Sequence, residues 1–380
     1  MAIPHISDDE RELIAAIREV ALKRVAPRAA EIDHTGEFPW DMQELLAQQG
    51  IYAMGFPVEY DGIGASELAI VMAIEELCRH CATTGLLLAV QQLGAMPILL
   101  AGNEAQKRKY IPPLASGEWM AAFGLTEAGS GSDAAAMRTV AVRKGDKYIL
   151  NGSKRFITNG GLAQVNSIFA HTDASKGTRG ISGFIVEKDF PGFSVGRIEE
   201  KMGIKGSQTA ELIFTDCEVP VENLLGQEGE GFKIAMMTLD RTRIGIGAQA
   251  VGIAQGALDL AVSYSKQRVQ FNHPIADNQG IQFMLADMAT KVEASRLLVY
   301  SAAEMVDREM PNFGPFSAMA KMFASDSAMS VTNDAIQVLG GYGYMKEYPA
   351  ERMMRDAKIT QIYEGTNQIQ RLVIARDLLK

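Results

Sequence analysis

Cysteine and histidine, the residues that bind transition metals most often, are scarce in this sequence of 380 residues, with 3 and 5 copies. Three cysteines are too few for a disulfide framework in a chain of this size. Cys78 and Cys81 form a C-x-x-C pattern, which fits either a redox pair or two small residues on one face of a helix. The histidines contain no H-E-x-x-H motif and are scattered at His5, His34, His80, His171 and His273. The sequence therefore predicts no metal site.

A basic excess is also missing, since 46 acidic residues against 37 basic ones give a net charge of -9. Nucleic acids are bound mainly through clustered Lys and Arg, so this charge excludes that class of partner. The apolar stretch from Leu86 to Leu100 contains Gln91, Gln92, Gly94 and Pro97. A bilayer span needs about 20 apolar residues, so we expect no membrane segment there. The first residues match neither a signal nor a transit peptide, which predicts a cytoplasmic protein.

The common nucleotide-binding motifs are absent or out of context. No P-loop pattern occurs. Residues 245–250 match G-x-G-x-x-G/A, but a helical pattern precedes them where the dinucleotide motif requires a strand. We interpret these small residues as a close contact between packed helices.

The hydrophobic periodicity divides the chain into three regions, as expected for its length. Residues 1–120 show helical patterns, and Ser7 with Glu10 forms a capping box at the start of the first. Further helical patterns cover 41–49, 66–80 and 104–114. These residues predict an N-terminal α-helical domain.

Short β-rich runs replace the helical pattern in the middle region, 121–230. They lie at 139–142, 148–150, 167–170, 183–186 and 211–214. No long helices separate them, which favours an antiparallel β-domain. From 231 to 380, long helical patterns return at 231–267, 279–309, 315–339 and 366–379. The sequence thus predicts an α+β fold that ends in a four-helix bundle.

Several segments have the residue types of a ligand site, although each also has an ordinary structural interpretation. Residues 122–133, AFGLTEAGSGSD, form a polar loop whose backbone amides can face a ligand. Residues 156–160, FITNG, resemble a strand end. In 239–243, LDRTR, two Arg and an Asp on a helix typically form a solvated face or an ion pair. The double glycine in 337–344, QVLGGYGY, permits close ligand approach or a helix C-cap.

The segment 361–371, QIYEGTNQIQR, places Glu364 just before a predicted helix. Thr366 is suited to cap that helix, whose N-terminus favours an anion. An isolated glutamate is more often a surface charge, so Glu364 alone indicates no function.

Taken together, these motifs and the segment 268–271 with Gln279 resemble the acyl-CoA dehydrogenase family, most closely its short-chain, butyryl-CoA-like members. The resemblance covers essentially the whole chain in the expected order. It implies FAD-dependent oxidation of a short or compact acyl-CoA to the 2,3-enoyl-CoA, with Glu364 removing the α-proton and flavin N5 taking the β-hydride. It further implies a homotetramer, arranged as a dimer of dimers, that passes electrons to an electron-transferring flavoprotein.

The same resemblance implies roles for individual residues. Flavin contacts within one chain are expected at Leu125, Thr126, Ser132, Phe156, Thr158, Thr366 and Gln368. Flavin contacts from a neighbouring subunit are expected at Arg268, Phe271, Gln279, Gln337 and Gly341. Substrate contacts are expected at Ser132, Asp240, Arg243, Gly365 and Gln91. Many members have Trp where this chain has Phe156, and some branched-chain members carry their base at the position of Thr242, which cannot serve as one.

Four alternatives remain open. An acyl-CoA oxidase or a flavin-dependent enoyl-CoA reductase would use the same scaffold. A decarboxylating glutaryl-CoA enzyme is disfavoured, because residues 85–88 lack the Arg that such members carry. A non-catalytic CoA-binding protein would have lost the base or the flavin contacts. The acyl chain itself is undetermined, and Gln91 and Gln92 could face either the acyl pocket or solvent.

Overall fold

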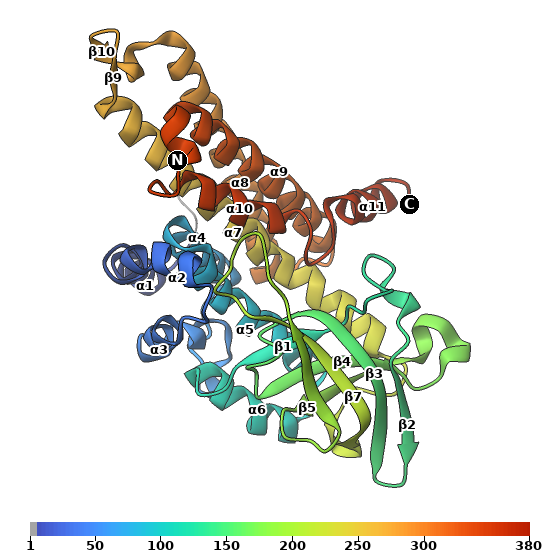
Figure 1. Cartoon of the computed structure of the whole chain (residues 1–380). Coiled ribbons are helices and arrows are strands. Elements are labelled where there is room, and N and C mark those ends of the chain that lie inside the picture. Colours follow the sequence, from blue (N-terminus) through green and yellow to red (C-terminus); the bar gives the residue numbers. More distant parts are fainter. Residues whose placement is uncertain (1–5) are drawn as a thin grey trace.

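The computed structural model describes residues 6–380. Along the chain, a group of helices precedes a β-sheet and a second group follows it (Figure 1). Helix α1 (Asp8–Val20) starts at the predicted capping box, where the Ser7 hydroxyl and the Glu10 carboxylate each accept the other residue's backbone N–H. The other N-terminal helices are α2 (Ala29–Thr35), α3 (Trp40–Gln48), α4 (Glu67–His80), α5 (Ala82–Ala101) and α6 (Glu104–Ser116). The helical prediction for this region is confirmed.

A single large sheet follows the N-terminal helices. Its strands are β1 (Ala121–Gly124), β2 (Val140–Lys144), β3 (Lys147–Thr158), β4 (Val165–His171), β5 (Ile181–Glu187), β6 (Phe193–Ile198), β7 (Thr209–Pro220) and β8 (Leu224–Leu225). Their order is β6-β7-β3-β2-β4-β5-β8, with β1 paired to β4. Most pairs are antiparallel as predicted, but β4 pairs in parallel with both β1 and β2. The sheet is therefore mixed at β4.

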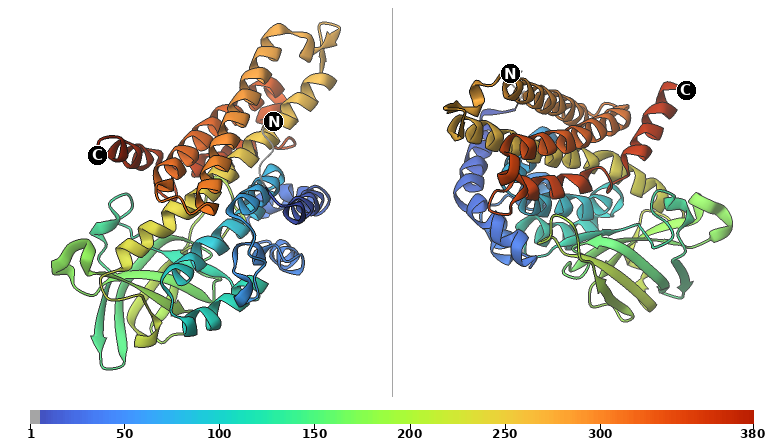
Figure 2. Two further views of the ribbon diagram at one scale, coloured as in Figure 1. Left: turned by 180° about the vertical axis from the view of Figure 1, so that it is seen from behind. Right: turned by 45° about the horizontal axis from the view of Figure 1, so that its top comes forward.

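The C-terminal region is a bundle of long helices. They are α7 (Gly231–Gln267), α8 (Gln279–Asp307), α9 (Phe313–Leu339), α10 (Ala350–Thr360) and α11 (Asn367–Leu378). Helix α7 runs from the sheet to the far end of the bundle, where β9 (Val269–Gln270) and β10 (His273–Pro274) form a small hairpin (Figures 1 and 2). The four predicted helices are present, and α10 is an additional helix that the sequence did not predict. The domain limits at 120 and 230 stay predictions.

Two helices, α5 and α7, are long and apolar enough to cross a membrane by length and composition alone. The complete helix begins at Ala82, so the apolar segment is longer than the pattern at residues 86–100 indicated. The expectation of no membrane segment there stays a prediction. In the fold, 78% of the apolar window of α5 and 83% of that of α7 are buried inside the protein. That burial is typical of core helices.

The glycine-rich stretch at residues 245–250 lies inside α7 and packs against other helices. A Cβ added at Gly247 would lie 2.9 Å from a Val299 methyl group on α8. This contact confirms the interpretation of the motif as close helix packing. Cys78 and Cys81 are also buried, and burial raises the pKa of both thiols, which keeps them protonated. Within residues 6–380, no cluster of three or more His, Cys, Asp or Glu is arranged to hold a metal ion.

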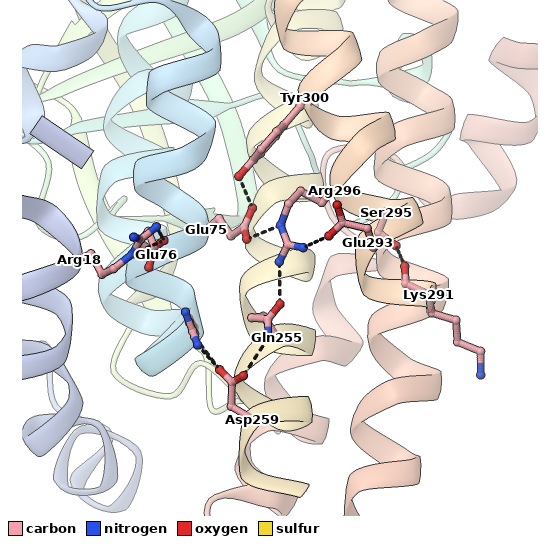
Figure 3. Close-up of polar contacts among 11 residues, drawn as sticks. Arg18, Glu75, Glu76, Gln255, Asp259, Lys291, Glu293, Ser295, Arg296 and Tyr300 are labelled. Carbon is pink, nitrogen blue, oxygen red and sulfur yellow. Dashed lines mark hydrogen bonds and ion pairs between the residues drawn. The ribbon is translucent and has the colours of Figure 1, made fainter. Parts of the chain in front are cut away.

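A network of charged side chains joins the N-terminal helices to the bundle (Figure 3). Arg296 on α8 donates to the Glu75 carboxylate on α4 (2.9 Å), to Glu293 (2.5 Å) and to Gln255 on α7 (2.7 Å). The Tyr300 hydroxyl donates to the other Glu75 oxygen at 2.9 Å. Buried charges are tolerated when they are paired and hydrogen-bonded in this way. The network fixes α4 against α7 and α8, and α4 and α7 also line the cavity described below.

Candidate active site

Glu364 lies in the loop between α10 and α11 and has a left-handed backbone conformation (φ 51°), which is uncommon for a residue other than glycine. Gly365 follows it at φ 93°. Three hydrogen bonds hold this strained loop. Gln370 Nε2 donates to the carbonyls of Glu364 (3.2 Å) and Gly365 (2.9 Å), and Lys321 Nζ donates to the Gly365 carbonyl (2.7 Å). Backbone strain that is held by its surroundings is typical of functional sites.

The Glu364 carboxylate is partly buried and accepts a hydrogen bond from Thr242 Oγ1 at 2.8 Å. Desolvation raises the pKa of Glu364 to about 7, although the Thr242 hydrogen bond and the charges of Arg243 and Lys321 favour the ionised form. A carboxylate with a pKa near neutral pH is suited to be a general base. No described residue accepts a hydrogen bond from the Glu364 backbone N–H, so this donor is available to a ligand.

Arg243 and Asp240 lie on α7, close to the base. Arg243 is 4% exposed, and its guanidinium donates to the Leu239 carbonyl (2.8 Å) and to Gln370 Oε1 (3.0 Å). Asp240 is partly exposed, with an oxygen 3.3 Å from Arg243 Nη1. Arg243 therefore supports the Glu364 loop through Gln370, and its ion-pair partner Asp240 is accessible enough to contact a ligand. The predicted CoA contacts of both residues stay predictions.

A buried ion pair holds the loop that follows β1, where Leu125 and Thr126 lie. Lys154 on β3 is fully buried and donates to Glu127 Oε1 (2.8 Å) and to the Leu125 carbonyl (3.1 Å). Glu127 also accepts the Thr139 hydroxyl at 2.6 Å and its N–H at 3.0 Å. Burial lowers the pKa of Lys154 to about 8. These bonds fix the backbone at Leu125 and Thr126, two of the predicted flavin contacts.

Phe156 lies at an irregularity in β3, where the pairing with β7 shifts register between Lys154 and Ile157. Its φ is 60°, and its aromatic side chain is 59% exposed. Thr158 follows at the end of the strand and is partly buried, while Ser132 is exposed. An exposed apolar ring on a residue with a strained backbone is consistent with a ligand or a second protein surface that covers the ring.

Thr366 caps α11 as predicted, because its hydroxyl accepts the Ile369 N–H at 3.3 Å. Gln368 in the first turn of α11 is exposed. The first turn of a helix presents free N–H groups and a positive dipole end, which fits an anionic group such as a pyrophosphate.

The other predicted flavin contacts lie at the far end of the bundle. Arg268 and Gly341 line a cavity of about 480 Å³, together with Tyr264 and Tyr342. Exposed side chains nearby in the sequence are Phe271, Gln279 and Gln337. Arg268 follows Thr242 by 26 residues of α7, a distance of about 40 Å along the helix at 1.5 Å per residue. This end of the bundle is thus too far from Glu364 to contact the same ligand within one subunit.

A cavity of about 420 Å³ extends from Thr242 between α4, α5 and α7. The apolar part of its lining includes Ile70, Ile74, Ala89 and Met96, and Gln92, Thr242 and Gly245 also line it. A charged part of its lining is formed by Glu67, Arg241, Asp307 and Glu309. Because Thr242 also donates to Glu364, the cavity lies next to the base and is suited to a compact apolar group.

Gln91 and Gln92 have different surroundings, and the substrate contact predicted for Gln91 stays a prediction. The Gln91 amide donates to the Leu114 and Trp119 carbonyls, both at 2.8 Å, and accepts the Ala121 N–H at 3.1 Å. Gln91 thus joins α5 to α6 and β1. Gln92 lines the cavity beside Gly55, and its Nε2 has no hydrogen-bond partner among the described residues.

These two glutamines provide a matched pair of substitutions. We expect Gln91→Leu to lower the free energy of unfolding by at least about 2 kcal/mol, because it leaves buried carbonyls and an N–H unpaired. Gln92→Leu should change it by less than about 1 kcal/mol, because the amide nitrogen lost has no partner. Denaturant titration of both variants followed by circular dichroism measures the difference. An equal loss in the two variants would contradict their assignment.

Sequence reasoning missed the buried lysines Lys154 and Lys321. One signal was available for Lys321, which shares the small apolar face of α9 with Ala318, Ala324 and Ala328. A lysine at a buried position of a helix requires a polar partner. For Lys154 the partner Glu127 is 27 residues away, and only the fold brings the two together.

The three family models that match this chain together cover most of it. They are the acyl-CoA dehydrogenase N-terminal domain at residues 7–118, the middle domain at 122–217 and the C-terminal domain at 229–379. An acyl-CoA dehydrogenase of Bacillus subtilis is 53% identical, with 99% of both chains covered. A cyclohex-1-ene-1-carbonyl-CoA dehydrogenase of Geobacter metallireducens is 50% identical, also with 99% of both covered.

Solved structures match equally well. Butyryl-CoA dehydrogenase from Megasphaera elsdenii is 48% identical with a TM-score of 0.97, and all of both chains is covered. A chain from a structure of the electron transferring flavoprotein of Acidaminococcus fermentans is 53% identical with a TM-score of 0.97 and 99% of both covered. An acyl-CoA dehydrogenase from Bacillus anthracis complexed with FAD is 35% identical with a TM-score of 0.91, covering 99% of this chain and 67% of the other.

Proposed function

The chain belongs to the acyl-CoA dehydrogenase family, an oxidoreductase family, and we propose that it oxidises a short or compact acyl-CoA to the 2,3-enoyl-CoA with FAD as cofactor. The observation that carries the proposal is the Glu364 carboxylate, which has a pKa raised to about 7 and is hydrogen-bonded to Thr242, a residue that lines a partly apolar cavity. A solvated surface glutamate would have neither property.

The protein residues would handle the α-proton. With the acyl chain in the cavity, the Glu364 carboxylate takes the proton from the α-carbon, and Thr242 keeps that carboxylate oriented. The developing negative charge on the thioester oxygen needs donors in fixed positions, and the unpaired Glu364 backbone N–H is suited to be one. The loop bonds from Lys321 and Gln370 keep this N–H and the carboxylate in one arrangement.

FAD, when bound, supplies a two-electron acceptor for the β-hydride. The residues available to hold it fit its chemistry: a fixed backbone at Leu125 and Thr126 for the polar ring edge, the exposed Phe156 ring beside Thr158, and the α11 N-terminus at Thr366 and Gln368 for the pyrophosphate. Ser132, which is exposed in the same loop region, can reach either a phosphate or the CoA chain.

A second subunit would complete the site. The cavity at Arg268 and Gly341 lies about 40 Å along α7 from Thr242, so these residues can serve FAD only in a neighbouring copy. Exposed Phe271, Gln279 and Gln337 would extend that contact. We propose a homotetramer built as a dimer of dimers, which passes electrons to an electron-transferring flavoprotein. The similar chain in the Acidaminococcus fermentans structure supports this partner.

The cavity of about 420 Å³ is large enough for a short straight or a compact cyclic acyl group. The similarity of the whole chain to butyryl-CoA and cyclohex-1-ene-1-carbonyl-CoA dehydrogenases supports the same two substrate types. The test is anaerobic mixing of the FAD-loaded protein with butyryl-, branched-chain, cyclohexane-carbonyl- and glutaryl-CoA, followed by flavin absorbance and product analysis. We expect at least one of the first three to reduce the flavin and yield the 2,3-enoyl-CoA. If none of the four lowers the flavin absorbance, the proposal is overturned.

A further inference from the structure

Lys321 is an ammonium group in an unusual place. It lies on the apolar face of α9 and is fully buried. Its Nζ donates to the Gly365 carbonyl at 2.7 Å and to Asn367 Oδ1 at 3.0 Å. Within residues 6–380, no carboxylate oxygen lies within 4.0 Å of it. Burying a charge without an ion pair is unfavourable, so the position requires an explanation beyond packing.

The other charges near the Glu364 loop are already paired. On α7, Arg243 Nη1 lies 3.3 Å from Asp240. On α9, Asp326 accepts hydrogen bonds from Arg371 of α11 at 3.0 Å and from Gln361 and Asn367. Among the described residues, Lys321 is therefore a buried cation near the Glu364 loop without a carboxylate partner. The phenol of neighbouring Tyr363 bonds to Gln249 instead.

The bonds of Lys321 also fall at the strained part of the loop. Gly365 at φ 93° has little space around it, because a Cβ there would lie 2.6 Å from Gln370 Nε2. Its carbonyl accepts hydrogen bonds from both Lys321 and Gln370. A loop in a left-handed conformation persists only when its surroundings hold it. Lys321 thus anchors the residue directly after the base from the bundle side.

We propose that Lys321 is a positioning residue for the catalytic base: it holds the Glu364–Gly365 loop through the Gly365 carbonyl and adds a buried positive charge that, with Arg243, favours the ionised Glu364 carboxylate. This inference rests on the proposed function of Glu364. Burial lowers the pKa of Lys321 to about 7, and the Glu364 charge opposes that shift. Loss of the ammonium would remove one of the influences that lower the pKa of Glu364, so that pKa would rise further.

The test uses the FAD-loaded full-length protein and two variants, Lys321→Met and Lys321→Gln. Gln keeps a hydrogen-bond donor but not the charge. The rate of flavin reduction by butyryl-CoA, or by whichever acyl-CoA reduces the parent, is measured in anaerobic stopped flow across the pH range. Because Glu364 acts in its ionised form, we expect the acid limb of the rate profile to move to higher pH in both variants, by up to about one unit. Lys23→Met, an exposed lysine on the N-terminal helices, should leave the limb in place.

Each outcome decides the inference. If Lys321→Met does not fold, the pH of the acid limb is measured with Lys321→Gln alone. A merely structural lysine would lower the rate or the FAD content without moving the limb, and an unmoved limb in the folded variants overturns the inference. A parent protein that no acyl-CoA reduces at any pH overturns the proposed function instead, and this inference falls with it.

Discussion

Replacing Glu364 with glutamine is expected to slow flavin reduction by acyl-CoA by about 10²- to 10⁴-fold, the contribution of a positioned general base. Glutamine has nearly the same shape, and its carbonyl oxygen can still accept the Thr242 hydroxyl, but it cannot take a proton. Stopped-flow mixing under anaerobic conditions measures the rate, and flavin absorbance before mixing measures bound FAD. We expect the FAD content to equal that of the parent, because Glu364 is separate from the predicted FAD contacts.

The pH dependence of the parent follows from the same residue. Desolvation raises the pKa of Glu364 to about 7, and the ionised form is the active one. The rate of reduction should therefore rise as the pH passes upward through about 7 and level off above it. Glu12→Gln, which changes an exposed glutamate on α1, should leave both the rate and the pH profile unchanged. A Glu364→Gln protein with more than a tenth of the parent rate would contradict the assignment of the base.

Replacing Arg296 with leucine is expected to lower the free energy of unfolding by about 3–5 kcal/mol, the typical cost of removing one partner of a buried ion pair. The substitution leaves the Glu75 carboxylate, whose side chain is 8% exposed, with only the Tyr300 hydroxyl as a donor (Figure 3). Burial already raises the pKa of Glu75, and loss of Arg296 should raise it further. The destabilisation should then be smaller at acidic pH, where Glu75 gains a proton. Denaturant titration at two pH values measures both effects.

Arg308→Leu is the matched control for Arg296→Leu. Arg308 follows the same helix and pairs with Glu304 at 3.3 Å, but its side chain is 64% exposed. Exposed ion pairs contribute roughly 0–1 kcal/mol, so this variant should unfold almost like the parent. Similar losses in the two variants would contradict the role given to the network between α4, α7 and α8.

The sequence predicted the fold wherever a local pattern was sufficient. Ser7 and Glu10 indicated the first helix start, because a capping box needs only four residues of chain. Helix α10 was missed because its N-cap residue, Pro349, provides no side-chain cap. Its charged residues are also placed by tertiary contacts, since Arg355 pairs with Asp33 at 2.7 Å, 322 residues away. Local periodicity contains no trace of such a partner.

The candidate site divides in the same way. Glu364, Thr366 and the loop at Leu125 were identified from motifs, because family resemblance carries them as contiguous residues. The sequence left the orientations of Gln91 and Gln92 open, and in the fold Gln92 lines the cavity while Gln91 faces α6 and β1. On a helix that is buried on nearly all sides, periodicity does not distinguish a residue facing the cavity from one facing β1. Lys321 was missed because its partners belong to a loop that only the folded bundle brings near.

The central claim is that Glu364 removes the α-proton of an acyl-CoA. The most direct measurement mixes the FAD-loaded parent and the Glu364→Gln protein with butyryl-CoA, or whichever acyl-CoA reduces the parent, carrying either hydrogen or deuterium on its α-carbon. We predict that the parent reduces its flavin, forms the 2,3-enoyl-CoA and is slowed by deuterium, while Glu364→Gln reduces its flavin at least about 10²-fold more slowly. Equal reduction in the two proteins, or a parent rate that is insensitive to α-deuterium, would contradict the claim.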